Sequence, residues 1–161
     1  MSLLQPAEWA PHDRVWTAWP SAADLWLDDL APAREEVADL VRAIDDEGRG
    51  EVVELLVNGD EAAASAHAAL GHTRTRFHQV QFGDIWLRDT GPIFVREDKG
   101  LAARDFGFNG WGGKFDLPGD PQVAAFVAAR AEVPAARCDW ILEGGAIDTD
   151  GTGLVVTTEQ C

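Results

Sequence analysis

The sequence predicts an α/β fold, a single domain over residues 1–161 in which strands and helices alternate and short hairpins recur. Along the whole chain, strand-like runs alternate with segments in which apolar residues recur at helical spacing. Hydrophobic residues make up 46% of the chain, which supplies enough apolar material for a core. A short motif also recurs at the mouths of two predicted hairpins. No low-complexity linker interrupts the pattern, so one domain is expected.

The first half of the chain predicts three strands and two helices. An apolar run at Val15–Trp19 is ended by Pro20, which favours a short buried strand. Residues 28–47 carry apolar side chains at helical spacing, which predicts the first helix. The elements that follow are a β-rich strand at 51–57, an alanine-rich helix at 61–70 and a strand at about 76–81.

The second half predicts two hairpins with a helix and a strand between them. The first hairpin pairs 91–96 with 101–106 around a polar turn that ends in Gly100. After the glycine-rich loop 107–119, Asp120-Pro121 is suited to start a short helix. The remaining elements are that helix at 122–132, a strand at 137–142, and a hairpin that pairs 146–149 with 154–158.

Two carboxylates occupy matching positions in this pattern. Asp89 is followed by Gly two residues later and by Ile four residues later, and Glu143 is followed by the same residues at the same spacing. Each comes after a predicted strand and at the mouth of a predicted hairpin. If the two units are related by rotation about a common axis, both carboxylates point toward that axis and meet in one site.

The charge of the chain limits the partners that can be expected. The 28 acidic and 13 basic residues give a formal net charge of −15, which repels phosphate backbones and anionic membrane surfaces. Neither nucleic acid nor a membrane is therefore expected as a partner. The acidity suits a cationic substrate, although a negative net charge most often serves solubility.

A cytoplasmic location is expected, because the chain shows no signal-peptide pattern and no run of about 18 apolar residues. The two cysteines, Cys138 and Cys161, are too few for a disulfide framework and form no CxxC pair, which fits a reducing compartment. His12, which precedes the first strand, is expected to be structural. The other histidines have no spacing typical of ligands, so no metal site is expected.

Asp89 lies in the motif GDIWLRDTGPIFV, close to Trp86 and Arg88. If the motif ends a strand, alternation places Trp86 and Arg88 on one face and Leu87 and Asp89 on the other, whereas a turn would relax this arrangement. A carboxylate accepts two parallel hydrogen bonds from a guanidinium, and an aromatic ring stacks on the same flat cation. The motif therefore suits an arginine-like ligand. The alternative is that Asp89 caps a turn and pairs with Arg88 or another local cation.

Glu143 ends an apolar strand in the motif LEGGAIDTDGTG. A lone carboxylate is costly there unless it has a partner or a task, and the two glycines that follow let backbone or substrate approach closely. Glu143 would then orient a histidine or move protons. The alternative is a structural Glu bonded to neighbouring backbone amides.

The loop FNGWGGKFDLPGD concentrates glycines around Trp111 and Lys114, and loops of this kind often line pockets. Trp111 would form a wall of the pocket and Lys114 a nearby charge, and the alternative is a surface loop that covers the core. The loop is not a nucleotide P-loop, because Phe115 rather than Ser or Thr follows Lys114. The strand that ends at Trp19 would deliver its indole to the same axis as a further substrate contact.

Four segments, EWAPHDRVWTAWP, GDIWLRDTGPIFV, FNGWGGKFD and LEGGAIDTDGTGLVVTTEQC, resemble in their order and separation the agmatine deiminases and the bacterial-type peptidylarginine deiminases. The resemblance spans nearly the whole chain, and four ordered motifs make it specific. It implies a pentein-type α/β propeller of ββαβ modules around a central site. This chain would carry roughly the first half of its five blades.

The resemblance also implies roles for residues. Asp89 would hold the substrate guanidinium, and Glu143 would pair with a catalytic histidine. The pocket would be shaped by Trp86, Trp111 and the glycines near Lys114, which are Gly112 and Gly113. A cysteine thiolate would attack the guanidinium carbon, expel ammonia and leave a thiouronium adduct that water hydrolyses. Agmatine would yield N-carbamoylputrescine, a step of polyamine biosynthesis from arginine, without a metal or organic cofactor, and peptidyl-arginine or arginine is the alternative substrate.

The chain departs from the family pattern at its reactive groups. The family's histidine lies in a later GHxD-type segment and its nucleophile in a later GGGNIHC-like segment, and neither occurs here. Cys161 corresponds to the end of a strand in the family pattern and is not expected to be the nucleophile. Cys138 is expected to be buried and inert. An N-terminal portion of a propeller is therefore expected, inactive alone and with an open edge through which copies associate. The second hypothesis is a non-catalytic module that binds cationic ligands.

Overall fold

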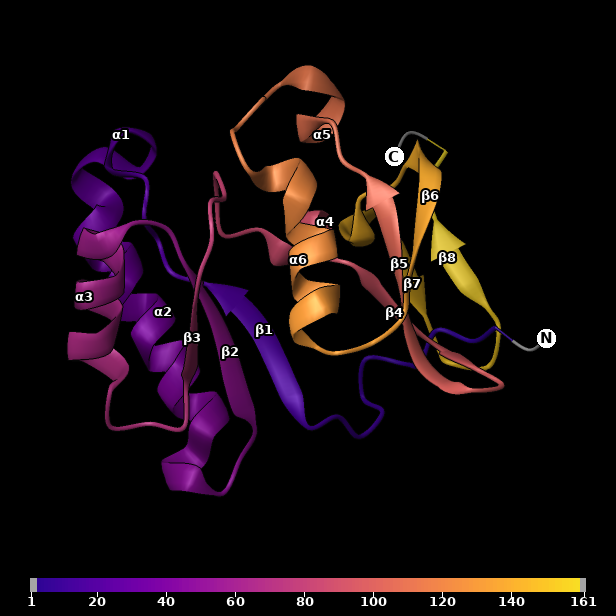
Figure 1. Ribbon diagram of the computed structural model, residues 1–161, viewed down its shortest axis with the longest axis horizontal. Coiled ribbons are helices and arrows are strands. Elements are labelled where there is room, and N and C mark those ends of the chain that lie inside the picture. The colour runs from indigo at the N-terminus through magenta and orange to yellow at the C-terminus, as the bar shows by residue number, and fades with distance from the viewer. Residues whose placement is uncertain (1–2, 160–161) are drawn as a thin grey trace. The chain divides into compact units, whose positions relative to one another are not determined.

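The computed structural model describes residues 3–159, which divide into two compact units (Figure 1). One is His12–Trp86, called here the 12–86 unit. The other, called the 87–159 unit, joins the residues up to Pro11 to those from Leu87 onward. The single domain expected over residues 1–161 stays a prediction.

A three-stranded parallel sheet forms the centre of the 12–86 unit. Its strands are β1 (Arg14–Ala18), β2 (Val52–Val57) and β3 (Arg76–Gln79), in the order β1-β2-β3. Two helices, α2 (Leu30–Asp45) and α3 (Asp60–Leu70), connect the strands. Parallel neighbours need such crossovers, because the chain must return to the same end of the sheet. Figure 1 shows both helices on one face of this sheet.

The face of the sheet beneath the helices carries the core of the unit. Val53, Leu55 and Val57 alternate along β2 toward the helices, and each is at most 1% exposed. They pack with Val41 of α2 and Leu70 of α3. Burial of one such side chain contributes about 1.5–3 kcal/mol. A shift of β2 by one residue would turn all three outward, so this apolar face fixes the register of the strand.

Glu54 points to the opposite face of β2 and is 2% exposed. Its carboxylate lies 3.3 Å from an Arg14 nitrogen, 3.1 Å from an Arg76 nitrogen and 2.6 Å from Nε2 of His78. Trp16 stacks on the His78 ring, with the ring centroids 5.2 Å apart. A buried carboxylate is costly without partners, and these groups on the flanking strands offset that cost.

The predicted elements of the 12–86 unit form close to their expected positions. The strands expected at 15–19, 51–57 and about 76–81 are confirmed as β1, β2 and β3, with ends shifted by one or two residues. The helix expected at 28–47 is α2, flanked by 3₁₀ turns at Leu27–Asp29 and Asp46–Gly48. The short helix α1 (Ala23–Trp26) was not predicted, because four residues are too few to show a helical period.

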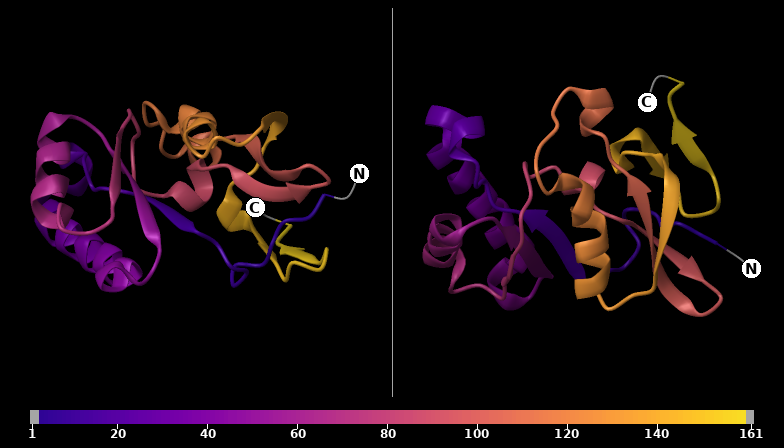
Figure 2. Two further views of the ribbon diagram at one scale, coloured as in Figure 1. Left: turned by 60° about the horizontal axis from the view of Figure 1, so that its bottom comes forward. Right: turned by 45° about the horizontal axis from the view of Figure 1, so that its top comes forward.

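A mixed sheet forms the centre of the 87–159 unit. β4 (Ile93–Glu97) and β5 (Gly100–Gly107) form an antiparallel hairpin, and β6 (Ala135–Ile141) pairs with β5 in parallel. The connection from β5 to β6 contains a 3₁₀ turn (Asp120–Gln122) and α6 (Val123–Arg130), and Figure 2 shows α6 alongside the two strands. The order strand, strand, helix, strand is that of the ββαβ module which the resemblance implies.

A second hairpin, β7 (Ile147–Thr149) with β8 (Val155–Thr157), completes the described chain. Ile147 packs against the buried side chains of Ile93 and Val95. Both hairpins and the helix and strand between them are confirmed. Three short helical segments in this unit were not predicted: α4 (Leu87–Thr90), α5 (Gly110–Gly113) and the 3₁₀ turn η4 (Gly144–Ala146). Within residues 3–159, no helix is both long enough and apolar enough to cross a membrane.

Candidate functional site

Asp89 lies in the helical turn α4, so its motif does not end a strand. Leu87 and Thr90 of this turn are buried, at 9% and 3% exposed. Gly91 ends the turn by donating its N–H to the Leu87 carbonyl at 2.8 Å, and a Cβ on Gly91 would lie 2.5 Å from the same oxygen. The strand alternation from Trp86 to Asp89 therefore does not apply, because Leu87–Thr90 form a turn in which successive side chains differ by about 100°.

The Asp89 carboxylate accepts hydrogen bonds from two other segments of its unit. Oδ1 accepts from the backbone N–H of Gly145 at 2.8 Å, and Oδ2 accepts from the indole Nε1–H of Trp111 at 3.0 Å. An ionised carboxylate has about four acceptor positions, so both oxygens keep capacity for a further donor. Arg88 does not pair with Asp89 as one alternative expected, since its guanidinium bonds to Glu8 and to backbone carbonyls.

Glu143 directly precedes η4, and its side chain is half-buried. Its backbone carbonyl accepts the N–H of Ala146 at 2.9 Å, but its carboxylate does not cap the turn. The alternative in which neighbouring backbone amides hold this carboxylate is therefore not supported. The carboxylate is available for a partner outside the turn.

The two carboxylate motifs lie in contact because Gly144 and Gly145 have no side chains. A Cβ on Gly144 would lie 2.1 Å from the carbonyl oxygen of Arg88, and a Cβ on Gly145 would lie 2.4 Å from Oδ1 of Asp89. Van der Waals repulsion forbids both distances. The two motifs are thus in contact within the 87–159 unit, and the meeting of their two carboxylates in one site stays a prediction.

Trp111 is placed beside Asp89 by a tight turn. Asn109 Oδ1 accepts the N–H of Gly112 at 2.9 Å, and Trp111 itself has a φ of 55°, in the left-handed region. That conformation costs a non-glycine residue about 1–3 kcal/mol. The hydrogen bond to Asp89 and an edge-on contact with Phe108, at a centroid distance of 4.9 Å, compensate this cost.

The three other predicted pocket residues of this loop, Lys114, Gly112 and Gly113, are exposed. The backbone N–H of Lys114 donates to the Gly110 carbonyl at 2.9 Å, which closes the turn. The loop is tied to the Asp89 motif by Trp111 and does not only cover the core. Substrate contacts of these three residues stay predictions.

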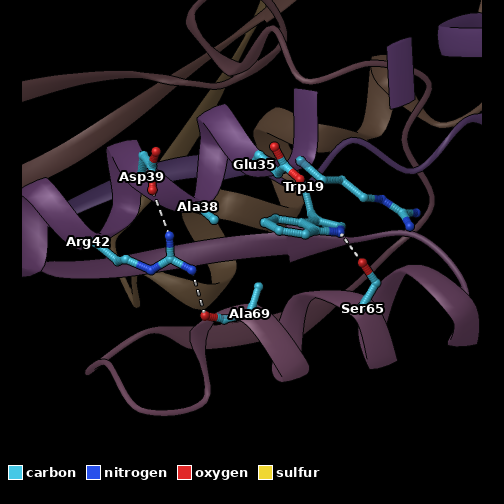
Figure 3. Close-up of a pocket in the computed structure, with 8 residues that line it drawn as sticks. Trp19, Glu35, Ala38, Asp39, Arg42, Ser65 and Ala69 are labelled. Atoms are coloured by element: carbon cyan, nitrogen blue, oxygen red, sulfur yellow. Dashed lines mark hydrogen bonds and ion pairs between the residues drawn. The ribbon is translucent and has the colours of Figure 1, made fainter. Parts of the chain in front are cut away.

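Trp86 and Trp19 belong to the 12–86 unit. Trp86 is 52% exposed, and its Nε1–H donates to Asp84 Oδ2 at 2.8 Å, which orients the indole. Trp19 is 1% exposed in the core beneath α2 and α3, and its Nε1–H donates to Ser65 Oγ at 3.2 Å (Figure 3). The structure gives Trp19 a packing role. The substrate contacts expected of both tryptophans stay predictions.

A cavity of about 380 Å³ lies beside the Trp19 indole, between α2 and α3 (Figure 3). Both arginines on its rim are already paired, Arg34 with Glu61 at 2.8 Å and Arg42 with Asp39 at 2.6 Å. Arg42 also donates to the carbonyl of Ala69 across the gap at 3.2 Å. The pair of Arg34 with Glu61 and the bond from Arg42 to Ala69 therefore connect α2 to α3, whereas the pair of Arg42 with Asp39 lies within α2.

Cys138 lies on β6 and is half-buried, where full burial was expected. Its Sγ lies 4.0 Å from the carbonyl oxygen of Ala136. The expectation for Cys161 falls outside the described residues. Between residues 3 and 159, no group of three His, Cys, Asp or Glu side chains could hold a metal ion.

Glu8 and Asn109 take part in this site, and neither was predicted. Asn109 carries a local signal, because Asn before a glycine turn commonly bonds the backbone two or three residues on. Glu8 pairs with Arg88 across 80 positions of sequence, which no local pattern reveals.

This α/β fold is the fold of solved deiminases. Agmatine deiminase of Enterococcus faecalis superimposes with a TM-score of 0.88 and 30% identity, over 99% of this chain and 44% of that one. The agmatine deiminase of C. jejuni has the same fold, with a TM-score of 0.82 at 22% identity.

The chain belongs to the Porphyromonas-type peptidyl-arginine deiminase family, whose sequence profile matches residues 4–161. Agmatine deiminase of Stutzerimonas stutzeri is 40% identical over 163 residues, and that of Pseudomonas aeruginosa is 37% identical over the same length. Each alignment covers 97% of this chain and 43% of the relative, so the chain spans less than half the length of these relatives. The family predicted from the four motifs is confirmed.

Proposed function

We propose that this chain contributes the guanidinium-binding part of an agmatine deiminase, with Asp89 as the residue that holds the guanidinium. The observation that carries the proposal is the half-buried Asp89 carboxylate, which Gly145 and Trp111 hold through neutral N–H donors. These donors fix the carboxylate plane and leave its negative charge uncompensated. A guanidinium presents two parallel N–H groups that fit such a carboxylate.

The proposed reaction is hydrolysis of agmatine through a covalent intermediate. A cysteine thiolate attacks the guanidinium carbon, a C–S bond forms, and the C–N bond breaks as ammonia leaves with a proton from a histidine. Water then attacks the thiouronium carbon and returns a proton to the histidine, the C–S bond breaks to restore the thiolate, and N-carbamoylputrescine is released with loss of the second proton of water to solvent. No metal or organic cofactor takes part.

Glu143 orients the histidine in this proposal. Its support is the position of Glu143, half-buried at the start of η4 and beside the Asp89 motif, with no capping bond to occupy its carboxylate. The histidine and the thiolate come from polypeptide outside the 161 residues. The chain alone then binds agmatine and does not hydrolyse it.

Agmatine is favoured as substrate over arginine or peptidyl-arginine. The relatives named above are agmatine deiminases. The net charge of −15 also attracts agmatine, a dication, more strongly than arginine, whose carboxylate offsets one of its two positive charges.

Isothermal titration calorimetry of the chain with agmatine tests the role of Asp89. Asp89→Asn preserves the shape of the side chain but loses a charge-assisted pair worth about 1.5–3 kcal/mol. The Kd is therefore expected to rise roughly tenfold to a hundredfold. Asp139→Asn, at an exposed position of β6, is the matched control, and putrescine, which lacks the guanidinium, is the control ligand. Equal agmatine affinity in the wild type and Asp89→Asn would refute the guanidinium role.

We propose in addition that the ββαβ module of the 87–159 unit is one blade of a five-bladed propeller. The order of its elements and the family support this proposal. A crystal structure in which successive modules are related by a rotation other than one-fifth of a turn would exclude it.

A second candidate function is a self-associating module that binds cationic ligands without catalysis. The observation that favours it is the exposure of large apolar side chains on two strands, 58% for Trp140 and 48% for Ile141 of β6 and 62% for Val156 of β8. Both strands lie at the edge of their sheets, so a strand from a second copy of the chain can pair with either.

A further inference from the structure

We infer that Arg88 is a positioning residue that fixes the turn carrying Glu143 relative to the Asp89 carboxylate. The inference rests on the proposed function, because it assigns a task to a residue between its two carboxylates. Arg88 acts through backbone groups of the protein and is not expected to touch the substrate.

The Arg88 guanidinium brackets the turn that follows Glu143. Its Nε–H donates to the Gly144 carbonyl and its Nη2–H to the Ile147 carbonyl, each at 3.0 Å. Gly144 and Ile147 are the first and fourth residues after Glu143. The third nitrogen, Nη1, pairs with Glu8 of the N-terminal segment, so all three nitrogens of the guanidinium are engaged.

The next residue of α4 holds the same turn through a different group. Asp89 Oδ1 accepts the N–H of Gly145 at 2.8 Å, so two consecutive side chains bind two carbonyls and one N–H of a single turn. The single helical turn α4 thereby positions both the Asp89 carboxylate and the first residues of η4.

The chemistry of this contact requires arginine. A guanidinium presents N–H donors in a fixed planar fork, which can satisfy two carbonyls and a carboxylate together, whereas the single ammonium of lysine cannot keep that geometry. Without the fork, the carbonyls of Gly144 and Ile147 lose their side-chain donor, and the Gly145 N–H is less firmly held against Asp89.

Amide hydrogen exchange followed by NMR, together with calorimetry with agmatine, tests the inference on the full chain. In Arg88→Met, the exchange rate of the Gly145 amide and the agmatine Kd are each expected to rise about tenfold. Arg88→Lys is expected to recover part of both, because it restores the charge but not the fork. Amides of β2, in the other unit, are expected to exchange at the wild-type rate. Arg96→Met, on β4 of the same unit and likewise exposed, is the matched control and is expected to change neither quantity.

Wild-type exchange at Gly145 and wild-type affinity in Arg88→Met would overturn the inference. If the wild-type chain does not bind agmatine, the proposed function fails, and the Gly145 exchange rate still decides the positioning role. If Arg88→Met does not fold, Arg88→Lys carries the test. Faster exchange at Gly145 in that folded variant supports the inference, and an unchanged rate refutes it.

Discussion

The Asp89 carboxylate shows how contacts within the fold assign residue roles that sequence leaves open. Trp86 lies three positions from Asp89 in sequence, yet its indole donates to Asp84, while Trp111, 22 positions away, donates to Asp89. Both tryptophans were predicted to shape the pocket. Only the structure distinguishes the tryptophan that orients the carboxylate from the one whose indole is fixed elsewhere.

Trp111→Phe separates the hydrogen bond of this residue from its ring. The variant loses the Nε1–H that reaches Asp89 Oδ2 and keeps an aromatic ring against Phe108. Agmatine affinity measured by calorimetry is expected to fall about twofold to tenfold, by about 0.5–1.5 kcal/mol, because water replaces the lost donor. Trp140→Phe, at an exposed indole on β6, is the control. A loss as large as that of Asp89→Asn would contradict a purely orienting role.

Asp45, at the end of α2, gives a prediction on pH dependence. The hydrogen bond from the Arg74 side chain is the largest cause that lowers the pKa of Asp45; burial raises it, and backbone N–H groups of Arg74 and Gly48 lower it further. A lowered pKa in the folded state stabilises the fold above the ordinary aspartate pKa of about 4, and this contribution is lost as the pH falls through the folded value.

Stability in urea is therefore expected to fall more steeply for the wild type than for Asp45→Asn between about pH 4 and pH 2. Asp13→Asn, at an exposed position before β1, controls for the loss of one carboxylate. Parallel pH profiles for the wild type and Asp45→Asn would show that the contact with Arg74 does not stabilise the folded state.

At the scale of elements, the periodic patterns predicted the strands and the long helices, and missed the single turns. A helix such as α2, with 16 residues, repeats its apolar positions several times, and β2 is a nearly continuous apolar run of six residues, VVELLV. α4 has four residues, and its burial of Leu87 and Thr90 depends on neighbours that are remote in sequence. The motif around Asp89 therefore gave no periodic signal for the helical turn that it forms.

Leu55→Ala tests the core that positions β2. Leu55 is 0% exposed beneath the helices, and its truncation is expected to destabilise the 12–86 unit by about 2–5 kcal/mol. The measurement is urea denaturation followed by circular dichroism. Leu40→Ala, on α2 at 51% exposed, is the matched control and is expected to cost within about 0.5 kcal/mol. Similar losses in both variants would contradict the assigned core.

At the scale of the molecule, β8 exposes apolar side chains that a second polypeptide could cover. Val155 and Val156 point to opposite faces of the strand, and they are 50% and 62% exposed. In folded proteins a hairpin of two strands is marginally stable unless at least one of its faces is covered. In a solution of the chain alone, a second copy of the chain can cover the exposed face of this hairpin.

Self-association is therefore expected to increase with concentration in sedimentation velocity experiments. Val156→Lys should shift the population toward monomer, because it places a charge on the apolar strand. Leu40→Lys, at a similarly exposed site on α2, should leave the population unchanged. A wild-type chain that stays monomeric at all concentrations would exclude the self-associating module.

The sequence by itself determined the α/β class, the main strands and helices, both hairpins and the family, because each depends on patterns within a few residues or on motifs in a fixed order. Only the tertiary structure decided how the Asp89 motif contacts the turn that follows Glu143. The bond from Gly145 to Asp89 spans 56 positions, and the Arg88 bonds to Gly144 and Ile147 span 56 and 59. Such contacts follow from packing of the folded chain and from the missing side chains of two glycines, and local propensity does not encode them.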